Sequence, residues 1–283
     1  MRLLQTIRKT INTLLEPIGI EVIKTKSKVL NLRDYPEKER PAVPQYINIG
    51  AGDFYHPFWH NVDMPNDYYA DRQRGRIQIQ YDLTSFKPIP FSNNSVRVAY
   101  TSHVIEHLRD EHVQHLFREV FRALKPGGYF RITCPDIDLE LDAYRRGDNS
   151  FWTEPNAYGI FNSTLEQCFL DHFASALTMT HPSNTKSLTD VDVQRVFATK
   201  TKEDALNCIV DQIPIEMRKG HPGDHVNWFN CEKIIRMLKE AQFEEIYESR
   251  YGQSHCAILR NTRLFDYTCP GLSLYVECRK PEI

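Results

Sequence analysis

A glycine turn followed by a carboxylate is the feature of this sequence that points most directly to chemistry. The largely apolar segment Tyr46–Ile49 runs into Gly50, Ala51 and Gly52, and a second short segment ends at Asp63. Glycines after a strand let the backbone approach a ligand where any Cβ would clash. A carboxylate at the end of the next strand can accept hydrogen bonds from both hydroxyls of a ribose. The pattern predicts a nucleoside-type cofactor across the top of an α/β sheet, although a plain tight turn would give the same glycines.

Other strand-like segments also end in polar residues. The third predicted strand ends near Asp82, the fourth runs into Ser102 and His103, and the fifth is followed by Asp136. Open parallel sheets bind their ligands at the carboxyl ends of the strands. Packing does not require polar residues there, so their presence at three strand ends favours a ligand site. These three predicted strands are residues 77–83, 96–100 and 129–134.

A helix is predicted between the fourth and fifth strands. Asp110 is its expected N-cap, and the Pro-Gly-Gly of residues 126–128 ends it. Strand, helix, strand in this order predicts a right-handed βαβ unit. Asn230 is expected to cap a later helix, before two last strands at 243–250 and 272–278. The apolar stripe of the helix between the fourth and fifth strands is Val113, Leu116, Phe117, Val120 and Leu124.

Composition limits the class of protein. The chain has 283 residues, of which 41% are hydrophobic and 25% charged, and a net charge of -2 from 35 basic and 37 acidic residues. This balance argues weakly against a nucleic-acid partner, which would favour a basic domain or stripe. Seven widely spaced cysteines without a Cys-x-x-Cys pair predict neither a disulfide framework nor a zinc site, but reduced thiols in a cytoplasmic protein.

Three parts of the chain are expected. Residues 1–44 hold an amphipathic helix at 2–15 and a Pro-rich linker. Residues 45–144 and 226–283 form the core, and residues 145–225 are an insertion that covers the cleft. Packing of the 2–15 helix on the main domain or on a second subunit is favoured over attachment to a membrane surface. No apolar run has the length of a membrane span, and no signal peptide is expected.

In the order and spacing of these motifs, the chain resembles class I S-adenosylmethionine (SAM)-dependent methyltransferases. It is most similar to the type-11 methyltransferase-like group associated with cell-surface glycan synthesis. Besides Ile47–Gly52 and Asp63, the matching segments are Ile-Pro-Phe-Ser-Asn-Asn-Ser-Val (89–96), His-Val-Ile-Glu-His-Leu (103–108) and Glu-Val-Phe-Arg-Ala-Leu-Lys-Pro-Gly-Gly (119–128). The resemblance implies an α/β fold, namely a Rossmann-like, doubly wound, mostly parallel seven-stranded sheet with an antiparallel last strand.

The resemblance also implies site residues. The backbone of Gly50, Ala51 and Gly52 would contact the methionine end of SAM, and Asp63 would bind the ribose. Asp82 would accept from the adenine amino group, and the backbone of Leu83 would pack on or bond to the ring. An Asp after a strand is equally a good cap for a turn. Ser102 and His103, which follow the fourth strand, are also expected at the cofactor.

Two departures from the family stand in the first loop. Asn48 occupies a position that is usually acidic, and Phe54 one that is usually glycine. Only ten residues separate Gly52 from Asp63, too few for a full first helix. The aromatic residues of that loop are expected to close the core in its place, with packing over the cofactor as the alternative.

Methyl transfer needs an aligned acceptor, exclusion of water and usually a base. His103 is one candidate base; a histidine bonded to a loop carbonyl is the alternative. His225 is the first choice among the polar residues of the insertion, the others being His172, His181, His221 and Asp224. Glu106 and His107 are expected to be structural, and no metal is predicted.

The predicted function is methyl transfer from SAM to an oxygen of a small molecule or glycan. The expected acceptor is a sugar hydroxyl or related group of a surface glycan or its precursor. A non-catalytic scaffold with the same fold is the alternative that Asn48 and Phe54 suggest. A nicotinamide dehydrogenase is disfavoured, because Tyr55 stands where its longer glycine turn needs a third glycine.

Overall fold

A seven-stranded sheet forms the centre of the computed structural model. The structure describes residues 45–67, 70–73, 75–152, 163–182, 186–214 and 221–282. The helix predicted at 2–15, with its membrane or dimer contact, lies outside these residues. The strands are β1 (Tyr46–Ile49), β2 (Trp59–Asp63), β3 (Ile79–Gln80), β4 (Val96–Ser102), β5 (Leu124–Pro135), β6 (Glu244–Ser249) and β7 (Ser273–Arg279).

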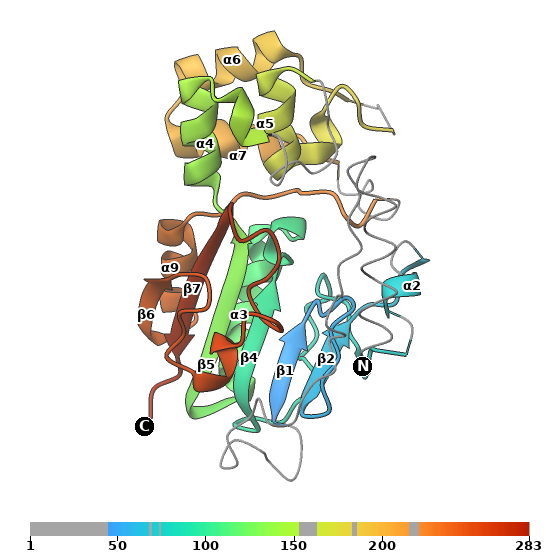
Figure 1. Cartoon of the computed structure of the whole chain (residues 1–283), viewed down its shortest axis with the longest axis vertical. Coiled ribbons are helices and arrows are strands. Elements are labelled where there is room, and N and C mark those ends of the chain that lie inside the picture. Colours follow the sequence, from blue (N-terminus) through green and yellow to red (C-terminus); the bar gives the residue numbers. More distant parts are fainter. Residues whose placement is uncertain are drawn as a thin grey trace, which may run out of the picture. The chain divides into compact units, whose positions relative to one another are not determined.

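The strand order confirms the predicted fold class. Strands follow one another across the sheet as β3-β2-β1-β4-β5-β7-β6 (Figure 1). Neighbours from β3 to β5 pair in parallel, whereas β7, the last strand of the chain, is antiparallel to both β5 and β6. The order reverses at β1 and β4, and open α/β sheets bind ligands outside the carboxyl ends of the strands at such a point.

The described residues also form α-helices and short 3-10 helices between the strands. The α-helices are α2 (Ala70–Gln73), α3 (Asp110–Ala123), α4 (Ile137–Arg146), α5 (Leu165–Ala174), α6 (Asp190–Thr199), α7 (Lys202–Val210) and α9 (Cys231–Glu240). Short 3-10 turns are η5 (Ile105–His107), η6 (Asn149–Trp152), η7 (Ser175–Leu177) and η8 (Ala257–Arg260).

The βαβ unit is present as predicted, with one correction at its helix start. α3 joins parallel strands β4 and β5. Its N-cap is Arg109 rather than Asp110, which is the first helical residue and whose carboxylate faces the positive end of the helix dipole. Asn230 caps α9 as expected, because its side chain accepts a hydrogen bond from the Lys233 amide at 2.9 Å.

The third strand is shorter than its sequence pattern. Only Ile79 and Gln80 pair with β2, although the Tyr81 amide still donates to the Asp63 carbonyl at 3.0 Å. Beyond that point the Asp82 carboxylate accepts from the amide and hydroxyl of Thr84, at 2.8 and 2.7 Å. This side-chain bond turns the chain away from the sheet and ends the strand.

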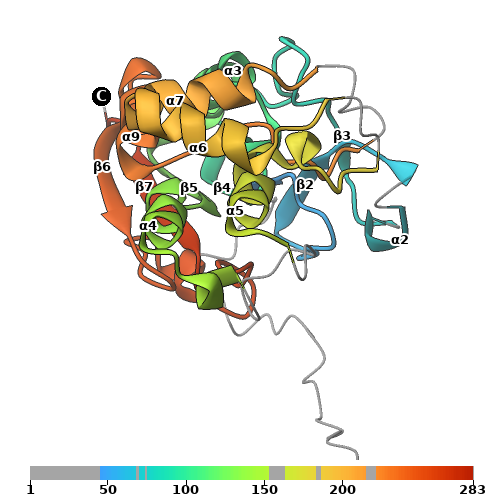
Figure 2. The same cartoon turned by 90° about the horizontal axis from the view of Figure 1, so that it is seen from above.

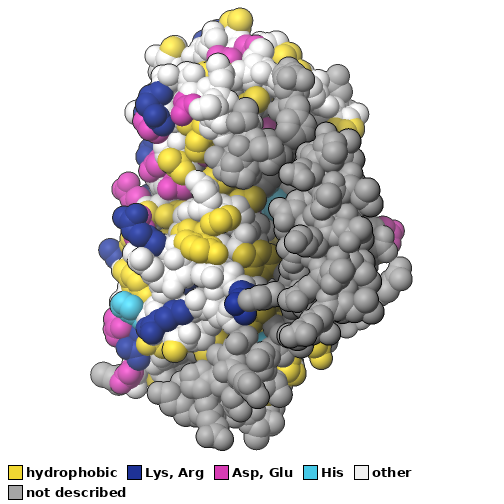
Figure 3. Space-filling model, in the orientation of Figure 1, with side chains coloured by type: hydrophobic (Ala, Val, Ile, Leu, Met, Phe, Trp, Pro, Cys, Tyr) yellow, Lys and Arg dark blue, Asp and Glu magenta, His cyan; other side chains and the backbone are white. Residues whose placement is uncertain are grey.

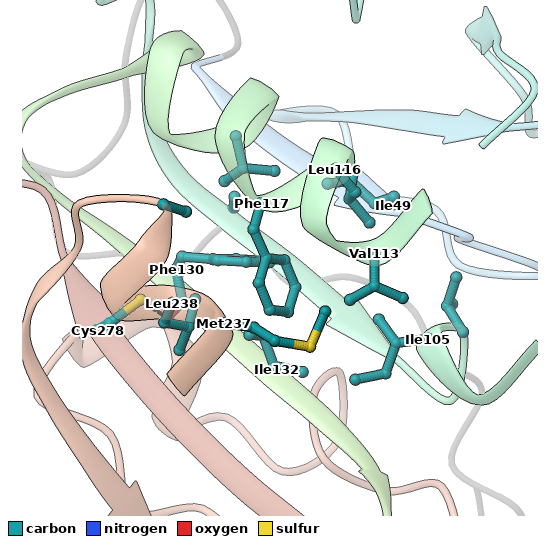
Figure 4. Close-up of a cluster of buried hydrophobic side chains, with 14 of the residues drawn as sticks. Ile49, Ile105, Val113, Leu116, Phe117, Phe130, Ile132, Met237, Leu238 and Cys278 are labelled. Atoms are coloured by element: carbon teal, nitrogen blue, oxygen red, sulfur yellow. Dashed lines mark hydrogen bonds between the residues drawn. The ribbon is translucent and has the colours of Figure 1, made fainter. Parts of the chain in front are cut away.

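One face of the sheet packs against α3 and α9. Val113, Leu116 and Phe117 of α3 lie inward between the strands and Met237 and Leu238 of α9 (Figure 4). The helical spacing of the α3 residues places them on one stripe, so the helix buries them together. Alternation along β1 sends Ile47 and Ile49 to this core and Tyr46 and Asn48 to the opposite face.

An aromatic cluster covers the opposite face near β1 and β2. Phe54 and Trp59 lie edge to face with ring centroids 5.8 Å apart, and both contact Phe265 from the far end of the chain. No helix stands between β1 and β2, where every residue is described. Both rings are buried, which agrees with the core interpretation, whereas Tyr55 is 52% exposed. Phe54 also lines the cavity described below, as the alternative expects.

Helices α4 to α7 form a layer beyond the carboxyl ends of the strands (Figures 1 and 2). The layer starts directly after β5, where Asp136 caps α4 by accepting from the Asp138 amide. It has a core of its own that extends from Ile137 to Trp228. The four helices therefore bury their apolar faces against one another instead of against the sheet.

The surface on the side seen in Figure 3 is mixed in charge. Basic and acidic side chains of the described residues are interspersed there and do not form a basic stripe. Among the described residues, no helix combines the length and apolar character needed to cross a bilayer.

Candidate active site

A cavity of about 430 Å³ opens at the carboxyl ends of β1, β2 and β4. Its size falls within the range of small-molecule sites. The residues predicted at a cofactor line it together: Gly50, Ala51, Gly52, Asp63, Asp82, Leu83, Ser102 and His103. The topology therefore brings together side chains from four separate segments.

The glycine turn shapes one wall of the cavity. Gly50 has φ +65°, and a Cβ built on it would lie 2.2 Å from Val104 Cγ2. Gly52 also has a positive φ, +54°, but a Cβ there would meet no atom within 4 Å. Gly50 is thus required by both conformation and close approach, whereas Gly52 leaves open space at the cavity for a ligand.

Asp63 is held in place by the same turn. Its Oδ2 accepts from the Gly52 amide at 2.9 Å, and its Oδ1 accepts from the Met64 amide at 2.8 Å. Each carboxylate oxygen has a second lone pair that can accept from a hydroxyl. The carboxylate is therefore pre-oriented for a diol such as a ribose.

Asp82 and Leu83 lie where the chain turns after β3. Asp82 caps the turn through Thr84, as the alternative interpretation anticipated, and it lines the cavity as well. Leu83 and Tyr81 add an apolar wall beside it, which suits a flat aromatic base. The two roles of Asp82 are compatible, because one of its oxygens, Oδ2, is not used by the turn.

His103 follows β4 in an unusual backbone conformation. Its φ is +52°, a left-handed value that is uncommon for a non-glycine residue and often marks a functional position. Its Nε2 lies 2.8 Å from Ser273 Oγ, and its Nδ1 lies 3.3 Å from Glu106 Oε1. The imidazole thus stands between the cavity and a buried carboxylate.

Glu106 is almost wholly buried behind His103. Its side chain is 2% exposed. Burial alone opposes its ionisation, but His103, followed by His107 and His225, outweighs burial and lowers the pKa of Glu106 to about 2. The carboxylate is therefore a negative charge fixed beside three imidazoles.

The structure does not bring His225 to the cavity. Its ring packs edge to face on His107, with centroids 4.9 Å apart, and its Nδ1 contacts the His172 carbonyl at 2.6 Å. Burial, followed by the charge of His107, lowers the pKa of His225 to about 3. His107, which was expected to be structural, lines the cavity instead.

The other polar residues of the insertion gather away from the cofactor residues. His172 is buried with its Nδ1 3.0 Å from Glu140 Oε1. His181 Nε2 lies 3.1 Å from Asp224 Oδ2, and its ring contacts that of His221. None of these four residues lines the cavity among the described residues, although the neighbouring Pro222 does.

Sequence reasoning missed the part of the cavity that comes from the segment before β7. Leu264, Tyr267 and Thr268 line the cavity from there. Asp266 anchors this segment, because its carboxylate forms a fully buried ion pair with Arg131 of β5 at 2.6 Å. A lone Arg within an apolar strand was the signal that a buried partner must exist.

Comparison with known proteins bears on this site. A family model described as a methyltransferase domain matches residues 60–132, from β2 into β5. Residues 60–132 of this chain are thus similar to a methyltransferase domain. The strand order and the cavity residues agree with this domain, and S-adenosylmethionine is its cofactor. No curated protein matches the sequence.

Solved structures similar to this chain overlap it weakly. One is a SAM-dependent methyltransferase of Mesorhizobium loti, with 14% identity and a TM-score of 0.40, covering 87% of this chain and 94% of that one. A phosphoethanolamine N-methyltransferase 2 of Haemonchus contortus, solved with SAM, has 14% identity and a TM-score of 0.38, covering 88% and 50%. A possible exported protein of Bordetella parapertussis has 11% identity and a TM-score of 0.36, covering 84% and 62%. The chain thus spans about half of the Haemonchus contortus protein and about three fifths of the Bordetella parapertussis protein.

Proposed function

We propose that this chain is an enzyme that transfers the methyl group of SAM to a hydroxyl oxygen of a small molecule or glycan. The observation that carries the proposal is His103, which lines the cavity with Glu106 behind it. A base next to the acceptor is what distinguishes a catalytic site from a binding module of the same fold.

The proposed reaction needs a methyl donor, an acceptor hydroxyl and a base for the hydroxyl proton. SAM supplies an activated methyl group on a sulfonium. The acceptor oxygen forms a bond to that methyl carbon while the carbon–sulfur bond breaks, leaving a neutral thioether. His103 takes the hydroxyl proton through Nε2 in exchange for its contact with Ser273, and Glu106 stabilises the imidazolium at Nδ1.

A sugar or related hydroxyl is the proposed acceptor, as part of surface glycan synthesis. Tyr267 and Thr268 offer an aromatic face and a hydroxyl on the cavity wall near His103, a combination that suits a polyol. Amines, phosphate-bearing molecules and other metabolites are the alternatives that an acceptor screen must include. A cytoplasmic location is part of the same proposal.

His103→Asn tests the catalytic role. Asn tolerates the left-handed backbone that His103 adopts, so the fold is retained. With saturating SAM and an active acceptor, we expect kcat to fall by about 10²- to 10⁴-fold, the usual contribution of a general base. Formation of S-adenosylhomocysteine is the readout, and His255→Asn, an exposed histidine outside the cavity, is the matched control. Unchanged turnover in His103→Asn would remove His103 from the mechanism.

A further inference from the structure

Glu106 is a buried carboxylate whose nearest charged or polar neighbours among the described side chains are imidazoles. Neither of its oxygens receives a well-aligned hydrogen bond from the described residues. His103 Nδ1 lies 3.3 Å away, and His107 Nε2 lies 4.0 Å away. A buried carboxylate without such bonds is costly, because water no longer solvates its charge.

The hydrogen bonds of His107 and His225 fix which ring nitrogen faces outward. His107 Nδ1 lies 2.9 Å from the Asp224 carbonyl, and His225 Nδ1 lies 2.6 Å from the His172 carbonyl. A carbonyl can only accept, so both Nδ1 atoms carry the proton. In each neutral ring, Nε2 is then a lone-pair donor suited to a metal ion.

Two hydrogen bonds hold together the chain segments that carry these three residues. The Val226 amide donates to the Glu106 carbonyl at 2.9 Å, and Asn227 Nδ2 donates to the Leu108 carbonyl at 2.8 Å. These bonds tie the segment that carries His225 to η5, which carries Glu106 and His107. One ligand atom from each of the three residues lies within 4.8 Å of the others.

We propose that Glu106, His107 and His225 form a binding site for a divalent transition-metal ion of the zinc class at the edge of the cavity. Two imidazole nitrogens and one carboxylate oxygen suit zinc, iron or cobalt, whereas magnesium and calcium prefer sets of oxygen ligands. Histidines that donate Nδ1 to a backbone carbonyl have the support typical of metal ligands. Ligand atoms around a zinc ion lie about 3.3 Å apart, so side-chain adjustments of roughly 1 Å would close the set.

The position of the ion follows from His107, which lines the cavity. A metal ion held there would lie next to the proposed acceptor region. The inference concerns the same site as the proposed function but does not depend on methyl transfer, because metal binding is measured without SAM or acceptor.

Binding of Zn²⁺ to the full chain tests the inference. After chelation and reloading, metal analysis of the wild type is expected to find about one Zn²⁺ per chain that dialysis does not remove. Glu106→Gln and His225→Gln should each retain less than about a tenth of that, since each loses one of three protein ligands. Mg²⁺ added in place of Zn²⁺ should not be retained.

A second cluster provides the matched control. His181, His221 and Asp224 also place one ligand atom each within 4.8 Å of one another. His181→Asn should retain Zn²⁺ if the ion binds at Glu106, and loss of Zn²⁺ in His181→Asn would overturn the proposal.

Crystals of the wild-type chain loaded with Zn²⁺ decide the matter even if the Glu106 variant fails to fold. Anomalous density bonded to Glu106, His107 and His225 is the expected result. Density only at the second cluster, or a chain that binds no Zn²⁺, would contradict the inference.

Discussion

At the scale of single residues, the glycine turn shows how tightly the cofactor side of the site is built. Gly50 combines a left-handed φ with a backbone that almost touches Val104, and Gly52 donates its amide to Asp63. The turn therefore sets both the shape of the cavity and the orientation of the carboxylate expected to bind the ribose.

Gly50→Ala is predicted to destabilise the fold more than Gly52→Ala. At Gly50 the new Cβ meets Val104 and an unfavourable φ, which together should lower the free energy of unfolding by about 2–4 kcal/mol. At Gly52 only the φ is unfavourable, so a loss of about 1 kcal/mol is expected. Urea unfolding of both variants measures this, and Val104→Ala combined with Gly50→Ala should recover part of the loss. Equal losses at the two glycines would count against the close-approach argument.

The residues predicted at the cofactor line one cavity because each follows a strand of recognisable pattern. The sequence did not predict that His107 lines the cavity. His107 and its neighbour Glu106 are equally typical of a structural turn, so the pattern does not distinguish them. His225 was predicted to reach the cleft, but it packs behind His107. Only the folded chain shows which of two adjacent polar residues faces the cavity.

At the scale of elements, buried and half-buried charged groups fasten loops to the sheet. Arg131 of β5 anchors the segment before β7 through Asp266 and also lies 3.4 Å from Glu277. On α3, Glu119 and Arg122 hold the loop after β3 by bonds to the backbone of Ile89 and Phe91. These bonds give a structural reason for the Ile-Pro-Phe segment that marks the family resemblance.

Arg131→Met is predicted to destabilise the chain by about 3–5 kcal/mol, because it leaves the Asp266 carboxylate buried without its partner. SAM affinity should fall as well, since the segment around Asp266 lines the cavity. Arg146→Ala, which removes an exposed ion pair on α4, is the control and should cost less than about 1 kcal/mol. Thermal unfolding compares the two; similar losses would show that the buried pair has no special role.

Glu119→Gln is predicted to make the free energy of unfolding depend less on pH in the acidic range. Burial opposes ionisation of Glu119, but its bonds to Arg122 and Ile89 outweigh burial and lower its pKa from 4.5. A carboxyl with a lowered pKa in the fold stabilises it fully above pH 4.5 and loses that contribution as the pH falls further. Wild type should therefore exceed the variant by about 1 kcal/mol near neutral pH, and the gap should shrink in acid. Urea unfolding at pH 7 and pH 3 measures the gap, and a gap that is constant with pH would refute this role.

Elements with a clear period were predicted from the sequence, and the others were not. α3 and the strands show apolar residues at helical or alternating spacing. α4 and α7 were not predicted, because their apolar residues pack within the helical layer instead of following the sheet. The end of the third strand depends on a single side-chain bond from Asp82, which no periodicity reveals.

At the scale of the whole molecule, the described residues form two cores, and residues of the first core line the cavity. The sheet with α3 and α9 forms the first core, and α4 to α7 form the second. The sequence indicated an inserted segment but not that it would have its own core, since distant residues such as Ile137 and Trp228 supply it. The cavity takes nearly all of its lining from the sheet side, which is why the cofactor was predictable and the acceptor was not.

Calorimetric titration of SAM into the full chain is the most direct test of the central claim that the cavity binds this cofactor. We predict one site per chain with a dissociation constant in the micromolar range, about −8 kcal/mol. Asp63→Asn should weaken binding by at least about tenfold, since it removes the charge that accepts the ribose hydroxyls, while Asp142→Asn on α4 should bind as wild type does. The absence of binding heat at several temperatures, in a chain that circular dichroism shows to be folded, would contradict the account.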